Sequence, residues 1–171
     1  MPQSAAINRV RCVIVFEQHY LLAQHRTRRP ESIGKWGLLG GRLKAPEDPR
    51  AGLRREVFEE LRVHLPYVVE LGDWPRRDEI HRVFGCHIGQ RVEWFERDEI
   101  VAIDWFRYDE VVQLAASGQL QTGFELAAIT AFRSQAAAGP ASIKLSRRPS
   151  KKVRGDRKAR GPKHGAEPTD R

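Results

Sequence analysis

Apolar residues form two short dense runs near the start of the chain and then recur at every fourth position. Residues 9–16 and 20–25 are rich in aliphatic and β-branched side chains, which indicates two strands of a hairpin around a short polar turn. Leu53, Val57 and Leu61 then follow one another four positions apart, which is typical of a helix that buries one apolar face. We therefore predict a β-hairpin followed by a helix that ends near Leu61.

The rest of the chain continues with strand-like and helical patterns until its composition changes. Strands are predicted at residues 67–71, 80–88 and 100–106, with a loop over 74–78, and helices at 109–116 and 123–138. After Gly139 and Pro140 large apolar side chains become rare, which predicts disorder over residues 145–171. The pattern thus predicts one domain over residues 1–139 and a tail over 140–171.

The charge of the chain belongs to this tail. Residues 140–171 contain eleven Lys and Arg against three Asp and Glu, which accounts for the whole net charge of +8. A basic disordered tail favours weak contact with nucleic acid, whereas the neutral globular part gives no such indication.

Other features of the composition exclude several classes of protein. No apolar run is long enough for a membrane helix, and the N-terminus lacks an apolar signal core, so we expect a cytoplasmic protein. Cys12 and Cys86 lie in apolar strand-like segments and are interpreted as buried small side chains rather than a disulfide. The spacing of His81, Cys86 and His87 fits no structural zinc pattern.

Three carboxylates share one face of the helix that ends near Leu61. At 100° per residue, Glu59 and Glu60 lie on either side of Glu56, away from the apolar face. Such a cluster is costly unless cations occupy it, and oxygen ligands suit hard divalent ions such as Mg²⁺ or Mn²⁺. This face is the candidate metal site, and the alternative is an ordinary charged surface helix.

The residues around this helix resemble the sequence box of the Nudix hydrolases. The matching positions, in chain order, are Gly41, Glu47, Arg55, Glu56, Val57, Glu59 and Glu60, at the spacing of the family pattern. Two positions depart from it: Arg62 stands where the family has a glycine, and Leu39 where relatives often have a proline. The first departure affects the turn after the helix, because glycine favours the left-handed conformation there.

The resemblance implies a fold and a set of roles. The implied fold class is α+β, a Nudix-type α/β/α sandwich around a mixed β-sheet. Metal ligands would be Glu56, Glu59, Glu60 and the carbonyl of Gly40, with Glu99 before the aromatic pair at 105–106 as a further acidic ligand. Glu99 competes for that role with Glu96 and Asp98, and a solvated charge at a strand edge is the alternative.

The resemblance also assigns catalytic roles. Glu56, or a Glu outside the box, orients or deprotonates water, and Glu59 assists at the metal. Arg55 would orient the carboxylates, and Glu47 would anchor the loop on the helix.

Two further arginines are candidates for substrate binding. Arg26 belongs to a basic loop that either faces phosphates or is a solvated turn. Arg82 falls on a mostly apolar strand face, where it either contacts substrate or lays its stem on the core with its head in water.

The predicted activity is divalent-metal-dependent hydrolysis of the pyrophosphate linkage in a nucleoside diphosphate joined to another group. The partner is a nucleotide-derived small molecule: a nucleoside triphosphate, including an oxidised one, ADP-ribose or a nucleotide sugar all remain open. A homodimer is also left open. The competing hypothesis is a nucleotide-sensing or RNA-associated module in which the basic tail contacts phosphates.

Overall fold

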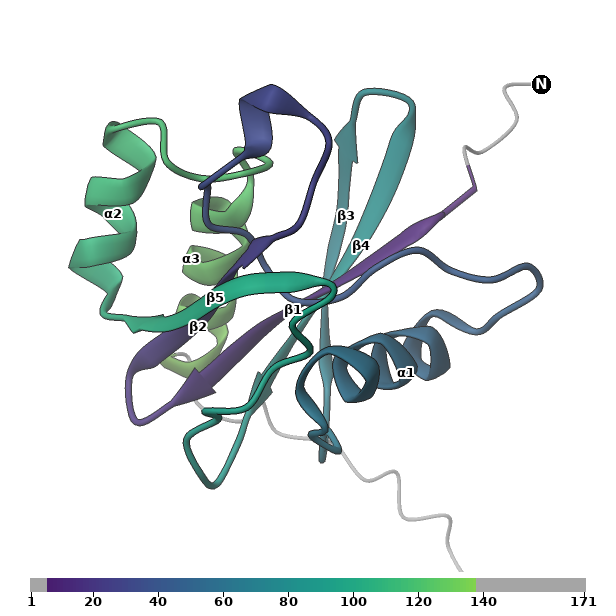
Figure 1. The fold of residues 1–171 in the computed structure, drawn as a ribbon. Helices are drawn as coiled ribbons and strands as arrows, with labels where there is room; N and C mark the ends of the chain where they lie inside the picture. The colour runs from purple at the N-terminus through teal and green to yellow at the C-terminus, as the bar shows by residue number, and fades with distance from the viewer. Residues whose placement is uncertain (1–5, 138–171) are drawn as a thin grey trace, which may run out of the picture. The chain divides into compact units, whose positions relative to one another are not determined.

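A computed structural model of the chain describes residues 6–137, which form a five-stranded sheet with helices on both faces (Figure 1). The elements in chain order are β1 (Arg9–Phe16), β2 (His19–His25), the 3₁₀ turn η1 (Pro30–Ser32), α1 (Pro49–Leu61), β3 (Val69–Arg76), β4 (Glu79–His87), β5 (Ile100–Phe106), α2 (Tyr108–Ala116) and α3 (Glu125–Ala137). The predicted hairpin and first helix are confirmed.

The sheet is mixed. Its strand order is β3-β4-β1-β2-β5, in which β1 and β4 run parallel and every other neighbouring pair is antiparallel. β1 lies at the centre, and its seven-position register with β4 brings Arg9 opposite His81. The mixed sheet that the sequence predicts is therefore confirmed.

Strands β1 and β2 separate beyond their turn, and a segment of the following loop fills the fork. The two strands pair only over Ile14 to Phe16 and His19 to Leu21. Farther along, isolated bridges join Cys12 to Leu39 and Ala23 to Gly37, so the loop lies between the two strands. This arrangement carries the glycines at 40 and 41 to the middle of the sheet.

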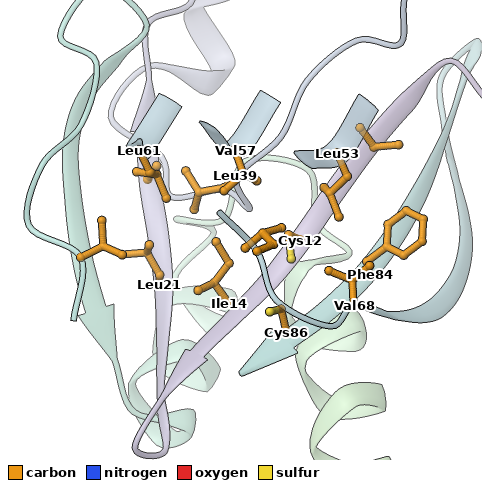
Figure 2. Packing of buried hydrophobic residues seen from close by; sticks show 14 of the residues in the cluster. Cys12, Ile14, Leu21, Leu39, Leu53, Val57, Leu61, Val68, Phe84 and Cys86 are labelled. Carbon is orange, nitrogen blue, oxygen red and sulfur yellow. The ribbon is translucent and has the colours of Figure 1, made fainter. Parts of the chain in front are cut away.

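Helix α1 covers one face of the sheet. Leu53, Val57 and Leu61 point from the helix onto the strands, where they meet side chains such as Ile14 and Phe84 (Figure 2). All of these side chains are buried, as are the two cysteines, which are free thiols. The predicted apolar face of the helix is thus confirmed by its packing.

Helices α2 and α3 cover the opposite face. Val13 and Val15 of β1 alternate onto this side and join a second buried cluster with Ile129 and Phe132 of α3. Gly85 lets α3 approach β4 closely, because a Cβ there would overlap the Phe132 ring. Two buried clusters on the two faces establish the three-layer α/β/α arrangement.

The hairpin of β3 and β4 differs from the sequence prediction. The predicted loop over residues 74–78 is mostly strand, and the turn contracts to Arg77 and Asp78. From the sequence, Gly72 and Pro75 are expected to interrupt a strand. However, β3 is an edge strand, where a proline and a bulge between Glu70 and Gly72 are tolerated.

The predicted tail lies outside the described residues. Within residues 6–137, no helix is both long and apolar enough to cross a membrane.

Candidate active site

Helix α1 is fixed at both ends by local chemistry. The Asp48 carboxylate accepts hydrogen bonds from the backbone N–H groups of Arg50 and Ala51, so it caps the helix before Pro49 at the first helical position. The helix ends at Leu61, and the next residue, Arg62, adopts a left-handed conformation with φ of 57°. Arg62 therefore takes the conformation expected of the family glycine that it replaces.

Glu47 and Arg55 join the preceding loop to the helix. Arg55 donates from Nε to Glu47 Oε1 at 2.8 Å and from Nη2 to Oε2 at 2.9 Å, and the backbone N–H of Lys44 also donates to Oε2 at 2.9 Å. These bonds lower the pKa of Glu47 to about 2, first through Arg55 and then through Lys44. The loop that precedes α1 is thereby fixed on the helix.

Arg55 also reaches the acidic face. Its Nη1 donates to Glu56 at 2.8 Å and to Glu59 at 3.1 Å. Glu56 is largely enclosed, whereas the side chain of Glu59 is 42% exposed. One guanidinium thus orients two of the three predicted carboxylates.

Glu60 is the most enclosed of the three, with only 2% of the residue exposed. The backbone N–H of Gly40 donates to its Oε2 at 2.8 Å, and His25 Nε2 lies 3.3 Å from its Oε1. Gly40 has φ of 117°, and a Cβ there would overlap the carbonyl of Val10. Only glycine fits the position that binds Glu60.

The carbonyl of Gly40 accepts a hydrogen bond from the guanidinium of Arg11 on β1. Arg11 Nη1 donates to the Gly40 carbonyl at 2.5 Å and to the Leu38 carbonyl at 3.1 Å. The neighbouring Gly41 lies against Glu56, since a Cβ there would overlap the Glu56 carboxylate. The glycine pair thus lies against two carboxylates: Gly40 donates its N–H to Glu60, and Gly41 packs against Glu56.

Glu99 and Arg26 are brought to the same region by backbone pairing. The backbone N–H of Arg26 donates to the Glu99 carbonyl at 2.7 Å, and Arg26 Nε donates to the Arg97 carbonyl at 2.7 Å. The pKa of Glu99 is raised, first by desolvation and then by the charges of Glu60 and Glu56. The pKa of Glu56 is also raised, chiefly by burial.

A cavity of about 500 Å³ brings most of the predicted site together. Gly40, Glu56, Glu60, Glu99 and Arg26 line it, together with the arginines at 9, 11, 29, 42 and 76. The lining therefore combines carboxylates with guanidinium groups. Glu59 and Arg55 do not line the cavity.

Arg82 is a third predicted site residue that does not line this cavity, and unlike Arg55, which reaches Glu56, it pairs with a carboxylate outside the lining. Its guanidinium donates to both carboxylate oxygens of Asp73 on β3, at 2.8 and 2.9 Å. Arg82 shares its strand face with Phe84, which packs under α1, whereas the cavity receives His81 from the other face. A difference of one residue along β4 thus moves the side chain to the opposite layer.

A larger cavity of about 1080 Å³ lies at the turn between β1 and β2, against α2 and α3. Its lining includes Tyr20, Tyr108 and Phe132, and none of the predicted site residues borders it. The clustered charges favour the smaller cavity as the site of chemistry.

The donor set of the smaller cavity suits a hard divalent cation. Glu56, Glu60 and Glu99 supply carboxylate oxygens, and the raised pKa values of Glu56 and Glu99 reflect burial and mutual repulsion that a cation would relieve. As the side chains stand, no group of three or more His, Cys, Asp or Glu within residues 6–137 is arranged to hold a metal ion. The carboxylates of Glu56 and Glu59 are instead held by Arg55.

Sequence reasoning missed Arg11, His25 and His81 as cavity residues. Arg9 and Arg11 interrupt an otherwise apolar strand at alternate positions, which is a recognisable sign of a polar patch on one strand face. The position of His25 depends on a bulge between Gln24 and His25, which no sequence pattern indicates.

Comparisons with known proteins agree with this geometry. A family model described as NUDIX domain matches residues 7–124. The Escherichia coli ORF135 protein has a solution structure with a TM-score of 0.61 and 24% identity, covering 82% of this chain and 99% of that one. The crystal structure of the MutT NUDIX hydrolase from Burkholderia pseudomallei has a TM-score of 0.51 and 29% identity, covering 59% of this chain and 84% of that one.

A local match connects the chain to a curated relative. The Mycobacterium tuberculosis protein named "Putative 8-oxo-dGTP diphosphatase 2" is 49% identical over 41 residues. That match covers 24% of this chain and 29% of the relative, so less than a third of the relative's length is compared.

Proposed function

The chain belongs to the NUDIX domain family, and we propose that it hydrolyses the pyrophosphate linkage of a nucleoside diphosphate joined to another group, using Mg²⁺ or Mn²⁺. The observation that carries this proposal is the cavity that is lined both by the carboxylates of Glu56, Glu60 and Glu99 and by several arginines. Such a lining suits a cation, held by the carboxylates, together with phosphate oxygens, bound by the guanidinium groups.

The carboxylates and the Gly40 carbonyl are the groups that would hold the metal. When bound, a divalent ion neutralises phosphate charge and lowers the pKa of a coordinated water. Glu60 is fixed for this role by the Gly40 N–H, and Glu56 by Arg55. Glu59, half exposed and also held by Arg55, would join from the outer side of the helix.

Glu56 and Glu99 are the candidate bases. Burial raises the pKa of Glu56, and partial desolvation together with the charges of Glu60 and Glu56 raises the pKa of the exposed Glu99, which makes each a better proton acceptor than an isolated glutamate. The carboxylate of Glu56 is the more confined of the two, because Arg55 and Gly41 contact it. We therefore assign Glu56 as the base that accepts the proton of the attacking water.

The arginines bind the phosphate chain. Arg26 and Arg11 line the cavity and present their charges beside the carboxylates. Each guanidinium already bonds backbone carbonyls, which holds it in place before substrate arrives. We propose a nucleoside triphosphate as substrate, including an oxidised one, because a relative's name specifies 8-oxo-dGTP; ADP-ribose and nucleotide sugars are the other classes to test.

A panel of nucleotide derivatives incubated with Mg²⁺ tests the proposal. Turnover of at least one member is expected, and Glu60→Gln should reduce it by about 10³-fold, because the amide keeps an acceptor for Gly40 but loses the charge. Glu93→Gln is the matched control, since Glu93 is exposed and does not line the cavity. Absence of turnover across the panel, or equal turnover by Glu60→Gln, would refute the activity.

A second role rests on the tail. Its charge equals the whole net charge of the chain, so we propose weak, salt-dependent contact with nucleic acid. Removal of residues 140–171 should abolish RNA binding without changing turnover of a small substrate, and binding that is insensitive to salt would contradict this role.

A further inference from the structure

Buried polar atoms without a hydrogen-bond partner are concentrated at one cavity. Within residues 6–137, the side chains with such atoms are Arg11, His25, His81, Gln121 and Thr122, and all five line the cavity of about 500 Å³. Buried polar atoms are normally paired, and an unpaired one costs roughly 1–3 kcal/mol. Their gathering at a single cavity indicates that a ligand supplies the missing partners.

These side chains divide into two groups. His25 belongs with the carboxylates, because its Nε2 lies 3.3 Å from Glu60. His81 belongs to the other end of the site, since β4 is separated from β5 by both β1 and β2 in the sheet. β4 and β5 are three strand positions apart, so His81 and Glu99, which directly precedes β5, come from well-separated parts of the sheet.

Gln121 and Thr122 are held rigidly beside this second end. Arg76 Nη2 donates to the Gln121 carbonyl at 2.9 Å and Arg76 Nε to the Thr122 carbonyl at 3.3 Å. The backbone N–H of Gln121 donates to Trp36 at 2.8 Å. The side chain of Gln121 lies over Gly37, where a Cβ would overlap its Oε1. The two polar side chains are therefore positioned by the backbone and not by each other.

His81 presents an uncharged ring to the cavity. It is only 2% exposed, and its ring meets the Phe124 ring edge-on at 5.2 Å between centroids. Burial, followed by the charges of Arg11 and Arg9, lowers the pKa of His81 to about 4. At neutral pH the imidazole therefore offers one donor and one acceptor.

Resting on the proposed hydrolysis, we propose that His81, Gln121 and Thr122 form the subsite that binds the base of the nucleotide. Arg11 stays with the carboxylate end, because its Nη1 donates to the Gly40 carbonyl. An imidazole, an amide and a hydroxyl supply neutral donors and acceptors, as the edge of a nucleobase requires. Phosphate would instead be matched by free guanidinium groups, but Arg9 is paired with Glu79 at 2.7 Å and Arg76 is bound to backbone carbonyls. The phosphates are left to the carboxylate and metal end.

The subsite is tested by measuring which base the enzyme prefers, with substrates that carry the same sugar and phosphates and differ only in the base. The probes are dATP, dGTP, dCTP, dTTP and 8-oxo-dGTP, and the readout is the ratio of kcat/KM between the preferred base and the others. Thr122→Val and Gln121→Leu should each lower kcat/KM for the preferred base by about tenfold, and change the others by less than about twofold.

Matched controls come from outside the cavity. Thr130→Val and Gln113→Leu make the same chemical changes on α3 and α2, and neither residue lines the cavity. Both controls should keep the wild-type ratio of kcat/KM. An equal loss of kcat/KM for every base in Thr122→Val and Gln121→Leu, or no loss, would overturn the subsite.

Binding of nucleoside monophosphates, followed by calorimetry, separates this proposal from the hydrolysis itself. If no member of the nucleotide panel is turned over but one monophosphate binds selectively and Thr122→Val removes that selectivity, the activity fails and the base subsite stands. If triphosphates are turned over without base preference and no monophosphate binds selectively, the activity stands and the subsite is refuted.

Discussion

Arg55 binds both carboxylate oxygens of Glu47 in a two-pronged ion pair, with distances of 2.8 and 2.9 Å. The same guanidinium also reaches Glu56 and Glu59, so the loop before the helix and the acidic face depend on one side chain. The planar fork of Arg fits this geometry, whereas the three N–H donors of a Lys ammonium cannot make all four of these hydrogen bonds.

Replacement of Arg55 by Lys should therefore affect both stability and catalysis. We expect the free energy of unfolding to fall by about 1–3 kcal/mol, because the partly buried carboxylates lose charge-assisted hydrogen bonds. We expect kcat/KM to fall by about 10–100-fold, since Glu56 loses the group that orients it. Urea denaturation and steady-state kinetics measure the two effects, and an unchanged kcat/KM would contradict the orienting role.

The extent to which this site follows from the sequence can be seen in particular residues. The helix and its acidic face were predictable, because the spacing of Leu53, Val57 and Leu61 separates an apolar side from the Glu side. The strand face of Arg82 was also predictable, but not that Arg82 pairs with Asp73 on β3 while His81, from the other strand face, lines the cavity. Which layer covers which strand face depends on long-range packing that local patterns do not encode.

Gly52 shows the same limit inside α1. Glycine in a helix is expected to cost roughly 1 kcal/mol relative to alanine. In the structure a Cβ at Gly52 would overlap Leu43 and lie 3.0 Å from Glu47, so glycine lets the preceding loop pack against the helix. The cost of glycine in the helix is therefore offset by close packing between α1 and the loop that precedes it, which the helical pattern of the sequence does not reveal.

Metal binding should release protons at mildly acidic pH. Burial and neighbouring carboxylates raise the pKa of Glu56 and Glu99, so both hold protons at a higher pH than an isolated glutamate. A divalent cation favours the charged form, and its affinity should therefore weaken as the pH falls toward these raised pKa values. Calorimetry in buffers of different ionisation enthalpy counts the protons, and Glu99→Gln should lower that count.

His81 should make stability depend on pH between about 4 and 6.5. Burial lowers the pKa of His81 to about 4 in the folded protein, whereas an unfolded histidine titrates near 6.5. In this window the unfolded state binds more protons, so the free energy of unfolding rises with pH, by up to about 3 kcal/mol. Urea titrations across the window should show a shallower slope for His81→Gln than for the wild type, and equal slopes would exclude this contribution.

Gly41→Ala should damage the site more than the fold. The backbone of Gly41 is not left-handed, so alanine is tolerated there, but its Cβ would overlap the carboxylate of Glu56 and force that side chain to move. We expect kcat/KM to fall by about 100-fold, because small displacements of catalytic groups are costly. Gly89→Ala is the matched control, since a Cβ at Gly89 meets nothing within 4 Å, and kcat/KM should remain at the wild-type value.

Arg62 should be nearly neutral when replaced by glycine and destabilising when replaced by alanine. Its left-handed conformation costs about 1–2 kcal/mol for any residue with a Cβ. The guanidinium offsets this cost by lying 5.5 Å from the Phe58 ring centroid and 5.3 Å from that of Trp94, contacts worth roughly 0.5–1 kcal/mol each. Arg62→Gly removes both the cost and the contacts, so its free energy of unfolding should stay within about 1 kcal/mol of the wild type.

Arg62→Ala keeps the cost and loses the contacts, so it should be less stable than Arg62→Gly by about 1 kcal/mol or more. Equal stability of the two variants in urea denaturation would show that the left-handed turn carries no cost at this position.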